Sequence, residues 1–239
     1  MPNDHMTLAA AIFDVDGVLL ASPHERAWRE ALAGFADPER FTTAIYQAHV
    51  AGKPRLSGAL AALRELGVPD AQEKALAYAE RKQRRLEALI EGGAVATFPD
   101  AMRFVGAVKS MGLPMAVASS SKNANRMLKI IRFSAEQSLL DIFSVNVCGR
   151  DLRRGKPDPE IFLLAAAELG MTPARCFVAE DAPAGVEAAR AGGMAALGVA
   201  RVHDATLLRA AGADIIVRSL DEIAVAELAF GRLAITRSE

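Results

Sequence analysis

The sequence predicts an α/β protein in which a helical domain is inserted after the first strand of a parallel sheet. Short apolar runs recur along the chain, and each stops abruptly at polar residues, which is typical of buried strands. Helix-length segments separate these runs, and this alternation favours a parallel sheet covered on both faces. From about residue 23 to residue 96 the alternation stops, and Ala, Leu, Glu and Arg dominate, as they do in helices.

The first expected strand is the run Ala9–Phe13, which ends at Asp14-Val15-Asp16-Gly17. Ligands of parallel α/β sheets collect at the carboxyl ends of the strands, so the polar residues that follow each strand are candidates for a site. Later strands are expected at residues 114–118, 176–179, 195–199 and 215–217, with helices at residues 100–111, 158–169 and 184–191.

The insertion is expected to span residues 23–96, which leaves residues 1–22 and 97–239 for the α/β core domain. Gly52-Lys53-Pro54-Arg55 is a turn inside it, and Gly92-Gly93 is a candidate hinge just before the α/β pattern resumes. Two connections join the insertion to the core, near residues 20–24 and 92–98. They can let the inserted domain open and close over the core.

The composition argues against several kinds of partner and indicates a cellular compartment. The 239 residues carry 28 Lys and Arg against 29 Asp and Glu, so the net charge is −1 and gives no electrostatic case for nucleic acid or an anionic membrane. No apolar run approaches the roughly 18 residues that span a bilayer, and Met1–His5 does not resemble a secretory signal. Cys148 and Cys176 have no CxxC spacing, so we expect no disulfide framework and a cytoplasmic location.

Two acidic pairs follow expected strands. Asp14 and Asp16 stand at positions i and i+2, from which they can point to the same side, and Gly17 permits a sharp turn. Carboxylates so close are costly to ionise together, so one interpretation is a nucleophile and a general acid/base beside Mg²⁺. Glu180-Asp181 can complete an oxygen-ligand Mg²⁺ site. The simpler alternative is that these carboxylates only close turns or cap helices, as Asp181 could before the next helix.

Two other strand ends suit an anion. Ser119-Ser120-Ser121-Lys122-Asn123 opens a helix, where hydroxyls and free N–H groups can bind phosphate, although simple capping is the commoner use of serine there. Gly155-Lys156-Pro157-Asp158 offers a lysine that can neutralise a phosphate or the carboxylates. Because all four segments are expected at the edge of one sheet, their coincidence favours a phosphoryl-transfer site.

These four segments, in this order, resemble the motifs of the haloacid dehalogenase superfamily, from Phe13-Asp14-Val15-Asp16-Gly17-Val18 to Glu180-Asp181. The insertion resembles the helical cap of the β-phosphoglucomutase-like subgroup, as do His24-Glu25-Arg26-Ala27-Trp28 and Arg81-Lys82. The resemblance covers nearly the whole chain and implies a Rossmann-like core domain with a helical cap domain inserted after the first strand. The segment Leu19–His24 departs from the pattern, because it is shorter than usual and carries Ala21-Ser22 where Asp-Thr or Asp-Ser is common.

The resemblance also implies roles for matching residues. Asp14 would be the nucleophile that becomes a phosphoaspartate, and Asp16 would be the general acid and base. Mg²⁺ would be held by Asp14, the Asp16 backbone carbonyl and Asp181, with Glu180 assisting. The other implied contacts are with the phosphorylated substrate: Ser119 and Lys156 at the transferring phosphate, Ser120, Ser121, Lys122 and Asn123 along the phosphate or sugar pocket, Arg55 at a distal phosphate, Lys82 on the sugar side, and His24 coupling closure to Asp16.

The residues of the insertion have simpler interpretations as well. Arg55 can be an ordinary surface arginine after a turn, and Lys82 lies in the run Arg81–Arg85, which is most often a solvated helix face. A histidine at a helix start, such as His24, is more often a surface residue than a coupling element. Trp28 is expected to pack inside the inserted domain.

Three functions follow from the resemblance. The most specific is a β-phosphoglucomutase that interconverts β-glucose 1-phosphate and glucose 6-phosphate through a bisphosphate. The main alternative is a phosphatase of sugar or other small phosphomonoesters, which would share every core residue. A more remote alternative is a non-catalytic module that binds a phosphometabolite. The expected ligand is a small phosphorylated metabolite such as a hexose phosphate, bound by a monomer or weak homodimer without nucleic acid or membrane.

Overall fold

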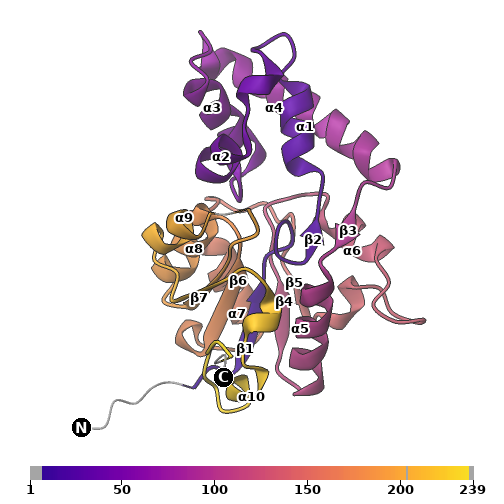
Figure 1. The fold of residues 1–239 in the computed structure, drawn as a ribbon, viewed down its shortest axis with the longest axis vertical. Coiled ribbons are helices and arrows are strands. Elements are labelled where there is room, and N and C mark those ends of the chain that lie inside the picture. Colours follow the sequence, from indigo (N-terminus) through magenta and orange to yellow (C-terminus); the bar gives the residue numbers. More distant parts are fainter. Residues whose placement is uncertain (1–6, 203, 237–239) are drawn as a thin grey trace.

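Six short strands in the described part of the chain form one parallel sheet in the order β5-β4-β1-β6-β7-β8. The computed structural model describes residues 7–202 and 204–236. From β1 the chain builds β4 and β5 on one side and then crosses back to β6 on the other (Figure 1). The carboxyl end of β1 therefore lies where the strand order reverses, the place at which such sheets bind ligands. The strands are β1 (Ala10–Phe13), β4 (Met115–Val117), β5 (Val145–Asn146), β6 (Cys176–Glu180), β7 (Ala195–Val199) and β8 (Ile215–Val217).

The central strands are buried on both faces. Successive side chains of a strand point to opposite faces, so Ala11 and Phe13 join one apolar cluster while Ala10 and Ile12 join another. Phe13 makes edge contacts with three other phenylalanines at ring-centroid distances of 5.9 to 6.3 Å. This packing fixes the end of β1, from which the chain continues directly into Asp14.

Helices cover both faces of the sheet. Buried residues of α7 (Glu160–Glu168), α8 (Pro183–Ala191) and α9 (Ala205–Ala210) belong to the cluster on one face. Those of α5 (Pro99–Ser110), α6 (Ala124–Ile130) and α10 (Val225–Leu228) belong to the cluster on the other. The near-continuous apolar runs of the strands are explained by this double cover.

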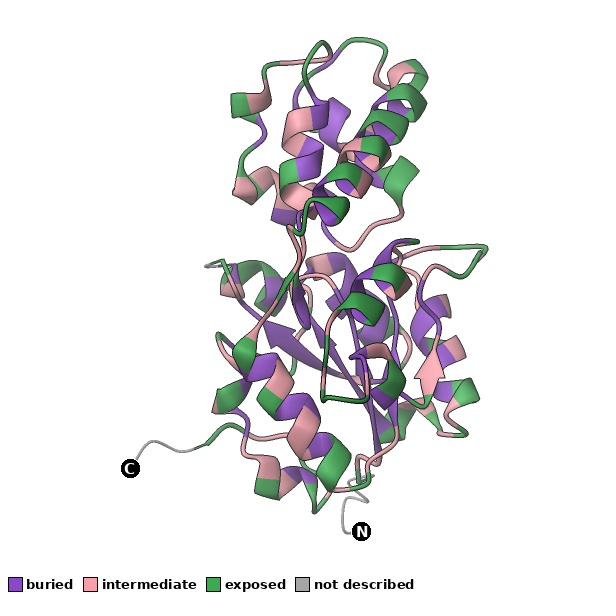
Figure 2. Cartoon of the chain, turned by 90° about the vertical axis from the view of Figure 1, so that its right-hand side faces the viewer, coloured by how far each residue is buried: buried purple, intermediate pink, exposed green. Residues whose placement is uncertain are grey.

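The inserted residues form a separate helical cap with its own core. Its helices are α1 (His24–Ala31), α2 (Thr43–Ile45), α3 (Arg55–Glu65) and α4 (Ala71–Glu91), and a π-helical turn spans Tyr46–Val50. Their buried faces point inward and their exposed faces outward (Figure 2). Trp28 is 4% exposed in this core and packs on Tyr78, whose hydroxyl donates to the Trp28 carbonyl at 2.9 Å. The expected packing role of Trp28 is therefore confirmed.

A two-stranded antiparallel ribbon joins the cap to the core. It consists of β2 (Leu20–Ala21) and β3 (Ala96–Thr97), which lie just after β1 and just before α5 (Figure 1). The predicted fold class, a Rossmann-like α/β core with a helical cap inserted after the first strand, is confirmed. The division into residues 1–22 and 97–239 for the core and 23–96 for the cap stays a prediction.

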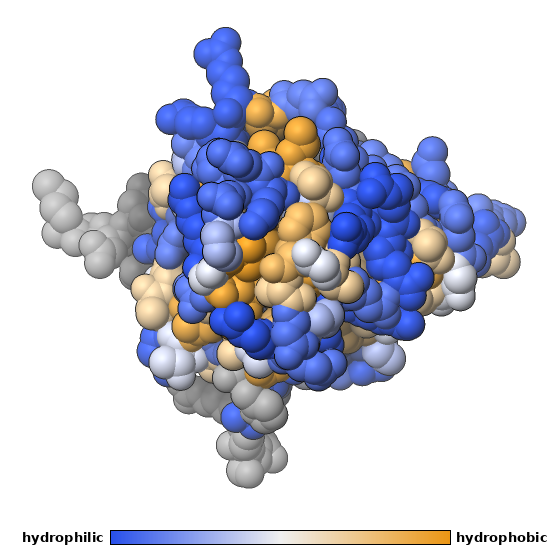
Figure 3. Space-filling model, turned by 90° about the horizontal axis from the view of Figure 1, so that it is seen from above, coloured by the Kyte–Doolittle hydropathy of each residue, from blue (hydrophilic) through white to orange (hydrophobic). Residues whose placement is uncertain are grey.

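Other expectations concern features outside the sheet. Cys148 and Cys176 are both buried free cysteines. None of the helices in residues 7–202 and 204–236 has the length and apolar character to cross a bilayer. The expectation about Met1–His5 lies outside the described residues. Seen from the cap end, the surface is mostly hydrophilic with a smaller apolar area (Figure 3).

Candidate active site

Asp14 and Lys156 form the centre of a buried ionic cluster beneath the cap. Asp14 follows β1, and its backbone N–H donates to the Ala179 carbonyl at 3.0 Å, which continues the pairing with β6. Lys156 Nζ donates to Asp14 Oδ1 at 2.5 Å and also to Glu180 Oε1. Burial alone would lower the pKa of Lys156, but these two carboxylates outweigh it and raise that pKa. The lysine is therefore charged and fixed against the candidate nucleophile.

The carboxylates around Lys156 fit a divalent cation. Asp14, Glu180 and Asp181 each offer an oxygen, and these oxygens lie within 4.8 Å of one another. Burial, followed by the charges of Glu180, Asp14 and Asp16, raises the pKa of Asp181 well above its usual value. One lysine does not neutralise four carboxylates, and oxygen ligands are those that Mg²⁺ prefers. The donor set therefore suits Mg²⁺.

Two glycines leave room for these carboxylates. A Cβ at Gly17 would lie 1.9 Å from Asp181 Oδ2, and Gly17 has a positive φ of 82° that strains other residues. A Cβ at Gly185 would lie 1.9 Å from the Glu180 carboxyl group. The alternative that Asp181 caps α8 is wrong, because among the described residues the cap residue is Ala182 and its N–H donates to Glu180 Oε2 at 3.1 Å.

Asp16 lies two residues after Asp14 in the same cavity. Its Oδ2 accepts a long hydrogen bond of 3.5 Å from Ser119, while its Oδ1 is buried with no hydrogen-bond partner among the described residues. Burial raises the pKa of Asp16, and a hydrogen bond with Ser22 and the charges of Lys82 and Lys156 oppose this only in part. A raised carboxyl pKa suits a general acid, which must hold its proton until the leaving group takes it.

His24 lies beside Asp16 and is neutral. Its Nδ1 is 3.4 Å from Asp16 Oδ1 and 3.0 Å from Ser22 Oγ, and its Nε2 is 3.2 Å from Ser121 Oγ. Burial, aided by the charge of Lys82, lowers the pKa of His24 well below 6.5. The contact with Asp16 is therefore not an ion pair. The alternative that His24 is a surface residue is wrong, because its side chain is only 12% exposed.

The segment Ser119–Asn123 touches the cap at several points. Ser120 Oγ donates to the Gly52 carbonyl at 3.3 Å, and the amides of Asn123 and Gln83 exchange two hydrogen bonds of 3.2 Å. Ser121 reaches His24, as described above. Lys122 lines the same cavity, but its Nζ donates to exposed Asp151 at 2.8 Å. These side chains therefore join the cap to the core over Asp14.

Two cations of the cap, Arg55 and Lys82, line the same cavity of about 250 Å³ as the acidic cluster; Arg55 is exposed, as the surface-arginine alternative expects, and Lys82 is buried. Arg55 begins α3 and has no ion-pair partner within residues 7–202 and 204–236. Lys82 is 4% exposed, lies 4.9 Å above the Trp28 ring, and has a pKa that burial lowers to about 7. The solvated-face alternative is therefore wrong for Lys82, which follows Ala75 and Ala79 on the buried face of α4.

Every candidate residue from the sequence is brought to this one place. Lys156 and Glu180 lie beneath the cavity floor, in contact with Asp14 or with each other. The remaining candidates line the cavity itself: Asp14, Asp16, His24, Arg55, Lys82, Ser119, Ser120, Ser121, Lys122, Asn123 and Asp181.

Sequence reasoning missed Tyr46 and Gln83, which also line the cavity. Tyr46 lies on the π-helical turn, a rare geometry that is frequent at functional sites. Burial, followed by the charges of Asp181 and Asp16, raises the Tyr46 pKa well above its usual value. No motif or spacing singles out Tyr46, whereas Gln83 directly follows Lys82 and could have been considered with it.

The parallel core, the helical cap and the acidic cluster beneath it define a capped α/β enzyme of the phosphomutase or phosphatase type. The chain belongs to the haloacid dehalogenase-like hydrolase family, whose model matches residues 8–193. The superfamily and subgroup inferred from the motifs are thereby confirmed.

Three similar proteins illustrate the range of the family. The chain is 35% identical over 243 residues to a β-phosphoglucomutase of Mycobacterium bovis (strain ATCC BAA-935 / AF2122/97), with 90% of each chain covered. It is 31% identical over 217 residues to a phosphorylated carbohydrates phosphatase of Thermotoga maritima, with 88% of this chain and 94% of that one covered. The crystal structure of an archaeal β-phosphoglucomutase from Pyrococcus sp. strain ST 04 superposes with a TM-score of 0.71 at 33% identity, covering 92% of this chain and 96% of that one.

Proposed function

We propose that this enzyme transfers a phosphoryl group through an aspartyl-phosphate on Asp14 with the help of Mg²⁺, and that it is a β-phosphoglucomutase. The observation that supports the proposal is the two-sided cavity, with Asp14 and its carboxylate neighbours on the core and Arg55 and Lys82 on the cap. A bisphosphate has two anionic groups far apart. One would meet Asp14 and the other the guanidinium of Arg55, whose fork of donors suits phosphate.

The residues of this chain would then act in a simple order. Asp14 attacks the phosphorus in line, and Asp16 gives its proton to the leaving oxygen. In the second half-reaction Asp16 takes the proton of the attacking hydroxyl as the phosphoryl group leaves Asp14. Lys156 and Ser119 hold the oxygens of the transferring group. When bound by Asp14, Asp181, Glu180 and the Asp16 carbonyl, Mg²⁺ would offset the charge that gathers on the phosphoryl oxygens.

A phosphatase is the second candidate, and the Thermotoga maritima relative favours it. The two functions differ in the acceptor of the phosphoryl group, which is a sugar hydroxyl in a mutase and water in a phosphatase. The contacts of Ser120, Ser121 and Asn123 with the cap favour the mutase, because a cap held against the core excludes water during transfer.

The distinguishing experiment supplies β-glucose 1-phosphate, a trace of glucose 1,6-bisphosphate and Mg²⁺. A mutase produces glucose 6-phosphate with little inorganic phosphate, so both products are measured in the same sample. Release of phosphate without glucose 6-phosphate would contradict the mutase and support the phosphatase.

Asp14→Asn is the matched control for this experiment, since it keeps the size of the side chain and removes the nucleophile. Both products should disappear in this variant. Turnover that survives Asp14→Asn would contradict the aspartyl-phosphate in either function. A screen of other sugar phosphates, scored for phosphate release and isomer formation, would then establish whether a hexose phosphate is preferred.

A further inference from the structure

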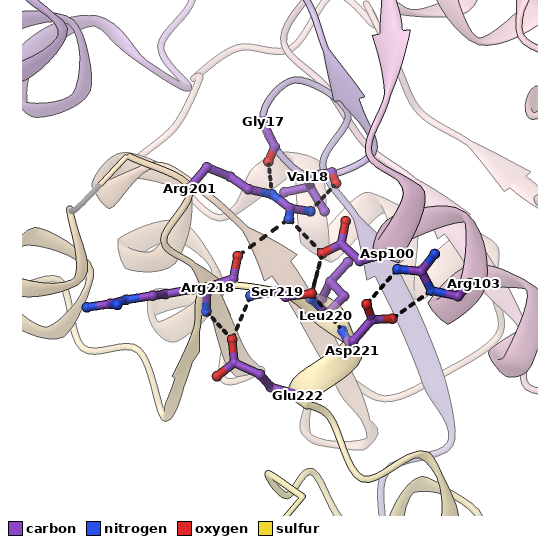
Figure 4. A network of polar contacts seen from close by, with 10 residues as sticks. All are labelled: Gly17, Val18, Asp100, Arg103, Arg201, Arg218, Ser219, Leu220, Asp221 and Glu222. Carbon is purple, nitrogen blue, oxygen red and sulfur yellow. Dashed lines mark hydrogen bonds and ion pairs between the residues drawn. The ribbon is translucent and has the colours of Figure 1, made fainter.

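Arg201 contacts the active-site loop from outside the four motifs. It follows β7, at the same edge of the sheet as Asp14, and its side chain is only 13% exposed. Its Nε donates to the Gly17 carbonyl at 3.3 Å, and its Nη2 donates to the Val18 carbonyl at 3.2 Å (Figure 4). Gly17 and Val18 directly follow Asp16. One guanidinium thus holds the two peptide groups that come after the candidate general acid.

The other side of the guanidinium is anchored in the core. Nη1 of Arg201 donates to Asp100 Oδ2 at 2.6 Å. The same oxygen accepts a hydrogen bond of 2.8 Å from the Leu220 N–H and one of 3.0 Å from the Ser219 hydroxyl. Asp100 is 7% exposed and lies in the first turn of α5. Because Ser219 and Leu220 hold the same oxygen of Asp100, this carboxylate is a fixed partner for Arg201 that does not depend on the Gly17–Val18 loop.

Arg201 also touches the second connection to the cap. Its guanidinium carbon lies 4.0 Å from the centre of the Phe98 ring, and Phe98 directly follows β3. Gly17 and Val18 lead into β2, which pairs with β3 in the ribbon that carries the cap. A single planar side chain therefore contacts the chain at the base of both connections, where the cap must pivot if it moves. A lysine could reach one of these groups but lacks the fork that contacts several at once.

We propose that Arg201 is a positioning residue that holds the Gly17–Val18 loop so that Asp16 meets the oxygen of the leaving group. The inference rests on the proposed phosphoryl transfer through Asp14 and adds a residue to it. A positioning role for Arg201 differs from a merely structural role in its effect on activity. A structural ion pair between Arg201 and Asp100 would affect stability alone, whereas a positioning residue would affect those reactions most that need the proton of Asp16.

The test uses two aryl phosphates that differ in their need for a proton. The 4-nitrophenolate of 4-nitrophenyl phosphate leaves readily without one, while the phenolate of phenyl phosphate needs protonation far more. In Arg201→Gln we expect kcat for phenyl phosphate to fall at least about tenfold more than kcat for 4-nitrophenyl phosphate, as partial loss of general-acid catalysis implies. KM for both substrates should change little, and Arg201→Lys should recover part of the loss.

Arg103→Gln is the matched control. Arg103 belongs to the same polar network, where it pairs with Asp221 at 2.6 Å, but it is exposed and does not touch the loop (Figure 4). This variant should keep the kcat values of the wild type for both substrates. Asp100→Asn, which weakens the anchor while keeping its size, should show the same selective loss as Arg201→Gln and carries the test if Arg201→Gln does not fold.

The outcomes separate this inference from the function on which it rests. Equal losses on the two substrates, or no loss, in the folded variants would overturn the positioning role while Asp14-dependent turnover of the wild type still supports phosphoryl transfer. Absence of Asp14-dependent turnover in the wild type would contradict the proposed function and overturn this inference with it.

Discussion

At the scale of the residue, the protonation of the buried carboxylates depends on how many of them Lys156 can neutralise. Asp14 and Glu180 share Lys156, whereas within residues 7–202 and 204–236 no lysine forms an ion pair with Asp181 or Asp16. Burial raises the pKa of all four carboxylates, and Lys156 offsets this only in part for Asp14 and Glu180. Asp14 and Asp16, two positions apart, differ in what opposes burial: the Lys156 ammonium lies 2.5 Å from Asp14, whereas no lysine among the described residues reaches ion-pair distance of Asp16.

Asp16→Ala is expected to lower turnover by at least about a hundredfold, as the loss of general acid and base catalysis implies. Metal binding should be largely kept, because the proposed ligand is the backbone carbonyl of residue 16. The measurement pairs kcat with a Mg²⁺ titration followed by calorimetry. Activity equal to that of the wild type would remove the acid/base role from Asp16.

The lowered pKa of Lys82 predicts that substrate binding depends on pH. Burial lowers the Lys82 pKa to about 7; the charge of Asp16 opposes this shift and that of Arg55 adds to it. The side chain is therefore charged below that pH and loses its charge above it. An anionic substrate should therefore bind less tightly as the pH rises through 7.

The Lys82 prediction is measured as the ratio of kcat/KM between the wild type and Lys82→Met from pH 6 to pH 9. The ratio cancels the titration of the substrate phosphate and should fall as the pH rises. Lys82→Arg keeps its charge throughout and serves as the control. A ratio that stays constant would show that Lys82 does not contribute through its charge.

At the scale of the element, the site depends on where strands end and how closely helices approach them. The carboxyl ends of β1 and β6 place Asp14 beside Glu180 because the two strands pair in register, with Phe13 opposite Ala179. α8 packs on β6 at Gly185, where the absent side chain leaves space for the Glu180 carboxylate. A strand end and a helix glycine thus jointly determine the position of one carboxylate.

Gly185→Ala should destabilise the fold by about 1–3 kcal/mol, because the new methyl group collides with Glu180 in a closely packed helix. Gly106→Ala in α5 is the matched control, since its methyl group would meet only Phe133 at an ordinary 3.7 Å. This control should gain about 0.5–1 kcal/mol from helix propensity. Urea unfolding of both variants measures the difference, and equal effects would contradict the crowding at Gly185.

At the scale of the whole molecule, a negative core edge faces a positive cap. The cavity between them is lined by Asp14, Asp16 and Asp181 on one side and by Arg55 and Lys82 on the other. Its carboxylates suit a bound cation, and its lysine and arginine side chains suit the phosphate groups of a ligand. The core also brings Lys122 and Arg150 to the cavity, and the cap adds Arg55 and Lys82 from the opposite side, so both domains contribute to the charges that surround a ligand.

Mg²⁺ should stabilise the folded protein, since the carboxylate cluster proposed to bind it exists only in the fold. At about a hundredfold excess over its Kd the gain would be about 2.7 kcal/mol, seen as a higher Tm. Asp181→Asn should raise the Tm without Mg²⁺, because it removes a buried like charge, and should lose most of the Mg²⁺-dependent rise. NaCl at equal ionic strength controls for screening. A Tm insensitive to Mg²⁺ in the wild type would argue against the metal site.

Arg55→Ala should reduce mutase turnover more than hydrolysis of 4-nitrophenyl phosphate, which has no distal phosphate to bind. Glucose 6-phosphate formation and nitrophenolate release, compared with the wild type, measure the two losses. Losses of the same size would remove the distal-phosphate role from Arg55 and leave the core mechanism intact.

Local patterns in the sequence were sufficient to predict the longer strands and the acidic and serine-rich segments that follow them. Apolar runs such as Ala9–Phe13 are stopped by polar residues because the strands are covered on both faces, and this contrast is visible without a structure. The strands β2, β3 and β5 were not predicted. They have two residues each, too few for periodicity to register.

The sequence by itself determined the α/β fold, the inserted helical cap and the set of residues available for phosphoryl transfer. Only the tertiary structure decided that Lys82 is buried, that His24 is neutral beside Asp16 and that Tyr46 and Arg201 contact the site. The physical reason is the range of the interactions. Hydrophobic period and strand ends are local properties of the chain, whereas burial and charge pairing depend on segments such as residues 17 and 201 that only folding brings together.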